Sequence, residues 1–156
     1  QAENDRSALG DYEVPMNENC SQREFLAHAA IEATKTLGVA GIITDSLTGE
    51  TVRHLAAFRG PNPILAICYK EKTQRWLNLS FGVIPVHQKE HAPAAYMFTA
   101  ALRMLRQKGY IGSDDKIAYL SGSFGLGNPT GTTFLEINKV SQVFDKSYEF
   151  HLPNKE

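Results

Sequence analysis

Cysteine is scarce in this chain, with Cys20 and Cys68 the only two among 156 residues. They lie far apart and form no CxxC pair, so the sequence indicates neither a disulfide framework nor a zinc site. Excess charge is also missing, because 16 basic residues stand against 17 acidic ones. A chain without a basic excess is not expected to bind nucleic acid or an anionic membrane surface. We expect free thiols and a cytoplasmic protein.

Long apolar runs and catalytic patterns are absent too. No run approaches the about 20 residues that a membrane-spanning helix needs. His87 and His91 lie four positions apart, but no third ligand stands out, so we expect no metal site. No serine or cysteine nucleophile is paired with a histidine in an evident order, and no two carboxylates divide into acid and base. We therefore expect no catalytic residue here.

What the chain does contain is the material for one α/β domain. Residues 1–20 are polar and read as a linker or arm, residues 21–140 form the domain, and residues 141–156 are a C-terminal extension. Apolar residues at helical spacing predict helices over 21–38, 48–60, 72–80 and 92–109. Short apolar or alternating runs predict strands over 39–44, 63–69, 82–87, 115–123 and 132–140.

This order predicts a three-layer α/β/α sandwich with a mostly parallel five-stranded sheet. The runs "VAGIIT" and "PILAICY" are apolar throughout, as expected of parallel strands buried on both faces. Pro85 places the third strand near an edge or at its own end. No room for a crossover helix separates the last two strands, so the last strand should be antiparallel.

Two packing expectations concern single helices. In the first helix the apolar residues at helical spacing are expected to form the buried face: Phe25, Leu26, Ala29, Ala33 and Leu37. Trp76, the only tryptophan, lies in an amphipathic stretch, and we expect it to serve packing rather than recognition.

The stretch "SGSFGLGNPTGTT" (121–133) is the most unusual local feature. A dinucleotide fingerprint needs a helix after the glycines, but a strand follows here. A P-loop needs a lysine, which the stretch lacks. Loops of small residues with free backbone N–H groups wrap anions, and they also serve as plain turns. The residues alone leave these two alternatives open.

A second loop, "TDSLTGETVR" (44–53), joins the first strand to the second helix. Ser46, Thr48 and Thr51 supply hydroxyls beside a helix N-terminus, which favours anions. The alternative is that Ser46 or Thr48 only caps the helix. In an open parallel sheet ligands collect at the carboxyl ends of the strands, and both loops leave from that edge.

From about Phe25 to Val140 the chain resembles the C-terminal domain of pyruvate kinase. The resemblance rests on "AHAAIEATKTLGVAGIIT", "TGETVRHLAAFRGPNPILAIC", "EKTQRWLNLSFGVIPV" and "KIAYLSGSFGLGNPTGTTFLEI". It implies an α/β domain excised from a longer enzyme whose preceding barrel domain carries the active site, with magnesium and potassium ions. The chain itself would use no cofactor. Its partners would be that barrel and neighbouring subunits of a tetramer.

The resemblance also implies an allosteric site for a sugar phosphate. Carried over residue by residue, Ser46, Thr48, Gly49 and Thr51 match the phosphate-binding loop, and Gly127, Thr130 and Gly131 match the loop that closes over the sugar. Tyr96 and Arg103 have the seven-residue spacing of an aromatic and an arginine that contact a second phosphate. An ordinary solvated helix arginine is the other interpretation of Arg103.

Several residues depart from the family pattern. Leu47 and Glu50 replace small or hydroxyl residues, Gly60 stands where proline is usual, and Phe134 follows "GTT" in place of asparagine. A carboxylate about 4–5 Å from a bound phosphate would repel it by roughly 3–4 kcal/mol at an effective dielectric of about 20. Two alternatives therefore stand beside effector binding: an interface-only domain with a degenerate site, or a free-standing α/β phosphate-binding protein.

Overall fold

The computed structural model describes residues 16–46, 48–58, 60–88, 94–122 and 132–143. Four helices and five strands alternate along them. The helices are α2 (Gln22–Thr36), α3 (Glu50–Ala57), α4 (Glu71–Leu77) and α5 (Ala94–Gln107). The strands are β1 (Val39–Ser46), β2 (Ile64–Cys68), β3 (Val83–His87), β4 (Lys116–Gly122) and β5 (Thr132–Lys139). In this part of the chain no helix is long and apolar enough to cross a membrane.

The strands form one sheet in the order β3-β2-β1-β4-β5, with β1 at its centre. The pairs β1–β2, β2–β3 and β1–β4 are parallel, while β5 lies antiparallel to β4. The predicted fold class is therefore confirmed, including the antiparallel last strand. Pro85 lies in β3, an outer strand, where its missing N–H costs no ladder hydrogen bond on the open side.

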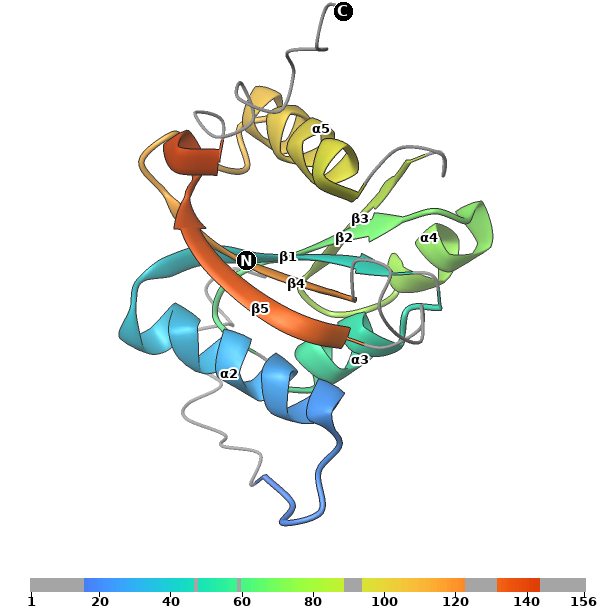
Figure 1. Cartoon of the computed structure of the whole chain (residues 1–156). Coiled ribbons are helices and arrows are strands. Elements are labelled where there is room, and N and C mark those ends of the chain that lie inside the picture. Colours follow the sequence, from blue (N-terminus) through green and yellow to red (C-terminus); the bar gives the residue numbers. More distant parts are fainter. Residues whose placement is uncertain (1–15, 47, 59, 89–93, 123–131, 144–156) are drawn as a thin grey trace, which may run out of the picture.

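Helices cover both faces of this sheet (Figure 1). On one face, residues of α2 and α3 pack with Leu77 of α4 in one buried cluster. On the other face, Ala101, Leu102 and Leu105 of α5 pack in a second cluster, which Val140 of a helical turn at 140–143 completes. The chain thus moves outward from β1 with its helices on one face, and returns through α5 on the other.

The start of α2 is fixed by a reciprocal capping arrangement. The Ser21 hydroxyl accepts a hydrogen bond from the Glu24 N–H at 3.2 Å, and the Glu24 carboxylate accepts one from the Ser21 N–H at 2.8 Å. The hydrogen bonds from the Ser21 backbone and side chain lower the pKa of Glu24. Gly38, with φ of 65°, follows the helix and lets the chain turn into β1.

The expected buried face of α2 is only partly right. Ala33 is buried and Leu26 packs against the buried cluster, as expected. Phe25 and Leu37 are 54% and 50% exposed. The face that contacts the sheet consists of Ala27, Ala30, Ile31, Ala33 and Thr34. Alanines surround this helix on several sides, so apolar spacing alone does not mark one stripe. Alanines occupy most of the buried face of α2 because their small side chains let the helix backbone approach the sheet closely.

Leu55 of α3 is completely buried in the first cluster, whereas Leu79, after α4, is 86% exposed. Leu55→Ala should lower the free energy of unfolding by about 2–5 kcal/mol, because it removes apolar contacts and leaves a cavity. Leu79→Ala should change it by no more than about 0.5 kcal/mol. Urea denaturation followed by circular dichroism measures both. Equal losses in the two variants would contradict the assigned core.

Candidate functional site

The carboxyl ends of β1 and β4 mark the point where the chain reverses its direction across the sheet. These strands pair in parallel, with Thr44 opposite Leu120, while α3 leaves β1 on one face and α5 precedes β4 on the other. Such a switch point opens a crevice at the carboxyl edge, where open α/β sheets place their ligands. The loop after β1 borders this edge (Figure 1).

The turn after β1 is closed by a side-chain hydrogen bond. The Ser46 hydroxyl accepts the Gly49 N–H at 2.7 Å, and Ser46 is buried. Gly49 then begins α3 with φ of 84°, a left-handed conformation that side chains disfavour. A Cβ atom on Gly49 would lie 3.4 Å from both Trp76 Cζ3 and Leu77 Cδ2, so α4 fills the space beside it. Ser46 therefore holds the turn, but the N-cap of α3 is Gly49, with no side-chain cap hydrogen bond, so neither Ser46 nor Thr48 is the N-cap that the sequence offered as the alternative.

The other two hydroxyl residues of the loop, Thr48 and Thr51, differ in their exposure to solvent. Thr51, in the first turn of α3, is buried with 8% exposure. Thr48 is exposed, directly before Gly49. Of the three hydroxyl residues in the predicted phosphate loop, only Thr48 offers its side chain to solvent. The N-terminal N–H groups of α3 lie in the same segment, since Glu50 is the first residue of that helix.

Glu50 does not stand as an isolated charge in front of this loop. Its Oε2 lies 2.5 Å from Nη1 of Arg23 on α2. The Glu50 side chain is 52% exposed and that of Arg23 is 20% exposed, so the pair is only partly withdrawn from water. Arg23 thus compensates the carboxylate that was expected to repel a phosphate, and it draws that carboxylate toward α2.

Of the remaining predicted site residues, only the side chain of Arg103 is among those that the structure describes. Arg103 is exposed on α5, nine residues after the helix begins at Ala94, or about 13 Å along its axis. An effector held at Thr48 must therefore cross the carboxyl edge of the sheet to reach it. Tyr96 belongs to α5, but its side chain lies outside the described residues. Gly127, Thr130 and Gly131, like Leu47, also lie outside them.

Comparison with known proteins identifies the family. Residues 24–137 match the family described as "Pyruvate kinase, alpha/beta domain". The chain belongs to this family. It is 33% identical over 123 residues to the pyruvate kinase of Borreliella burgdorferi, covering 78% of this chain and 26% of that protein. It is 29% identical over 122 residues to the pyruvate kinase of Lactobacillus delbrueckii subsp. bulgaricus, covering 76% and 21%.

A solved structure agrees on the fold. The domain matches a chain of "Cryptosporidium parvum pyruvate kinase in complex with ADP" with a TM-score of 0.73 and 21% identity, covering 80% of this chain and 25% of that one. The pyruvate kinase alpha/beta domain described here thus spans about a quarter or less of the length of these relatives. The resemblance seen in the sequence is confirmed.

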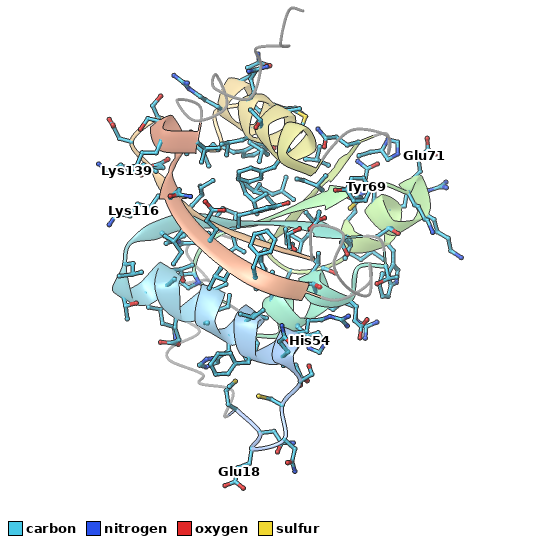
Figure 2. The ribbon with its side chains drawn as sticks, in the orientation of Figure 1. Glu18, His54, Tyr69, Glu71, Lys116 and Lys139 are labelled. Atoms are coloured by element: carbon cyan, nitrogen blue, oxygen red, sulfur yellow. The ribbon has the colours of Figure 1, made fainter. Side chains whose placement is uncertain are left out.

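A polar cluster on the α5 side of the pyruvate kinase alpha/beta domain was not predicted. The Tyr69 hydroxyl donates to Oδ2 of Asp45 at 3.4 Å, at the carboxyl ends of β2 and β1 (Figure 2). Within the described part of the chain, the buried Asp45 Oδ1 has no hydrogen-bond partner. Burial, with the Asp45 charge as a further cause, raises the pKa of Tyr119 on β4. Tyr119 therefore stays protonated at neutral pH, and its ring stacks 4.0 Å from that of Phe98.

Trp76 packs as expected, against Gly49 and under the Arg53 guanidinium, but it is not fully covered. Its side chain covers Gly49 but stays 47% exposed and borders a groove beside Thr48. The physical reason is that Leu77, the next residue, already fills the buried position of this short helix. The sequence held one signal that Trp76 would be partly exposed. Its helix has only seven residues, and Lys72 and Arg75 precede Trp76 on it, so few positions of the helix can be buried.

The two thiols of the domain should react differently. Cys68, at the end of β2, is buried, and burial raises its pKa to about 11, whereas Cys20 is partly exposed. Because the thiolate is the reactive form, iodoacetamide at about pH 8 should modify Cys20 and spare Cys68 in the folded chain. Mass spectrometry of the labelled peptides gives the site. In urea both thiols should react. A folded Cys20→Ser variant that is labelled at the same rate as the unmodified chain would contradict the assignment.

Proposed function

We propose that this chain is the regulatory and subunit-interface domain of a pyruvate kinase, and that the loop after β1 binds the phosphate of a sugar-phosphate effector. One observation carries the effector assignment. Arg23 compensates Glu50, while the Thr48 hydroxyl stays exposed at the start of α3. The loop therefore offers a hydroxyl donor and helix N–H groups to an anion without an uncompensated carboxylate beside them.

The whole enzyme would transfer the phosphoryl group of phosphoenolpyruvate to ADP, which gives pyruvate and ATP in glycolysis. That activity requires the barrel domain, and the chain spans too little of its relatives to include one. No three His, Cys, Asp or Glu residues gather as metal ligands within the described residues. We assign the magnesium and potassium ions of phosphoryl transfer to the barrel, and regulation and assembly in the cytoplasm to this domain.

The subunit-interface role is supported by the outer surface of α2. Phe25 and Leu37 are each about half exposed near the two ends of this helix. Apolar area that is exposed in the single chain stabilises an assembly when a partner covers it, by about 25 cal/mol per Å². A neighbouring subunit of a homo-oligomer, a tetramer in the complete enzyme, would supply that cover. This role stands even if the effector loop binds nothing.

A thermal-shift titration tests the effector site. Fructose 1,6-bisphosphate, glucose 6-phosphate and ribose 5-phosphate are the probes, and one at about 100 times its dissociation constant should stabilise the domain by about 2.7 kcal/mol, which is several degrees. Thr48→Val and Arg103→Ala should each reduce the shift, because each removes a phosphate donor. Thr36→Val and Arg106→Ala, at exposed positions of α2 and α5, are the matched controls.

The role of Glu50 separates effector binding from an interface-only domain. If Arg23 fully compensates the carboxylate, Glu50→Thr should change the affinity for the sugar phosphate by less than about threefold. A variant that gains binding where the unmodified chain shows none would mean that the native site is degenerate. No shift with any probe in either protein would overturn the effector assignment and leave assembly as the role of the domain.

The chain alone should be catalytically silent. Incubation with phosphoenolpyruvate, ADP, magnesium and potassium, coupled to reduction of pyruvate by lactate dehydrogenase, should show no turnover above the buffer rate. Addition of a complete pyruvate kinase to the same cuvette shows that the assay responds. Turnover by the purified chain would refute the division of labour between this domain and a barrel.

A further inference from the structure

The outer face of α5 is positively charged. Arg103 and Arg106 are exposed on this helix and Lys108 is exposed directly after it, while the helix itself contains no acidic residue. Gly109, with φ of 76°, ends this segment, and Tyr110 follows it with 48% exposure. Positive charge thus collects on one face of a chain whose net charge is −1. Such a surface favours a partner that carries acidic groups.

The same face also keeps apolar area in contact with water. Phe98 and Met104 of α5 pack against the second buried cluster, but each is only partly buried. The methylene stems of Arg103 and Arg106 add further apolar surface beside them. A guanidinium group stacks favourably on an aromatic ring. A partner for this face therefore needs aromatic side chains as well as acids.

The chain itself leads to this face of the molecule. After β5 it forms the helical turn at 140–143, where Val140 is completely buried and Val143 packs against the same cluster as α5. The Val140 N–H donates to the Asp115 carbonyl at 3.0 Å, which ties the turn to the loop between α5 and β4. The described part of the chain thus reaches Val143 on the side of the sheet that α5 covers (Figure 1).

The sequence that follows Val143 contains the side chains that such a partner needs. Residues 144–156 lie outside the described residues and beyond the family match, which ends at residue 137. Within them Tyr148, Phe150 and Leu152 alternate with polar residues, so an extended segment would present all three on one side.

The charge and length of this segment also fit. Asp145 and Glu149 supply two acids close to the aromatic residues. Residues 144–152 span up to about 30 Å when extended, whereas the 14 residues of α5 are about 21 Å long. The segment can therefore cover the outer face of α5 from the position of Val143.

We propose that residues 144–152 dock as an extended segment on the outer face of α5, with Tyr148 and Phe150 against the guanidinium groups of Arg103 and Arg106. Because the segment and the helix belong to one chain, individually weak contacts suffice to hold it. Docking does not depend on the effector site proposed above. A phosphate that binds Arg103 would compete with the segment for that side chain.

Limited proteolysis of the 156-residue chain tests the docking. Chymotrypsin cleaves after aromatic residues, and Tyr148 and Phe150 are sites for it within the segment. Cleavage there should be at least about tenfold slower than in a free synthetic peptide of residues 144–156, because a docked segment must open before the protease can bind it. Mass spectrometry identifies the cleaved bond. Equal rates in the chain and in the peptide would overturn the proposal.

Charge-reversal variants locate the docked segment. Arg103→Glu and Arg106→Glu should each raise the cleavage rate toward that of the peptide, since each removes a stacked cation and repels the acids of the segment. Arg75→Glu makes the same change at an exposed position of α4, which packs against the opposite face of the sheet, and should leave the rate unchanged. Circular dichroism confirms that each variant is folded. Protection that survives both α5 variants would place the segment elsewhere and refute its assignment to α5.

Dilution distinguishes docking within one chain from docking on a second copy. Protection of the segment should be independent of protein concentration, because the contact is intramolecular. Protection that disappears on dilution would mean that the segment covers α5 of a neighbouring molecule, which would overturn the proposed arrangement.

Discussion

The hydrogen bond from the Gly49 N–H to the Ser46 hydroxyl is the contact on which the turn after β1, and with it the carboxyl edge of the sheet, depends. It closes the turn within three residues of the end of β1, and the left-handed Gly49 then directs the chain into α3. The same turn presents Thr48 to solvent on one side and receives Trp76 and Leu77 on the other. A bulkier residue at Gly49 would strain the backbone and press on α4 at once.

This arrangement explains why the hydroxyls of one loop have separate roles. A buried hydroxyl that already accepts a backbone N–H has little left to give a ligand, and Ser46 is in that position. Thr48 is two residues further along and faces water. In this loop Ser46 fixes the conformation of the turn, and Thr48 exposes its hydroxyl to solvent. A rigid turn of this kind can hold a small number of polar groups in fixed positions.

The sequence was sufficient for the sheet because strand burial leaves a clear pattern. "VAGIIT" and "PILAICY" read as buried parallel strands, and β1 and β2 are buried along almost their whole lengths. The missing crossover before residue 132 predicted the antiparallel β5. The face of α2 escaped prediction because alanine is compatible with either side of a helix. The Arg23–Glu50 pair and the groove escaped because they join elements that are distant in the chain, and no local pattern encodes such contacts.

Near-neutral net charge constrains how this domain recognises any anion. At physiological ionic strength, charges separated by more than about 8 Å are largely screened in water. With a net charge of −1 the chain cannot attract a phosphate from a distance, so the groups beside the ligand must provide the binding energy. Exposed lysine and arginine contacts are each weak. In the proposed effector site the compensation of Glu50 by Arg23 would therefore matter as much as any cation, because it removes an uncompensated carboxylate from beside the Thr48 hydroxyl.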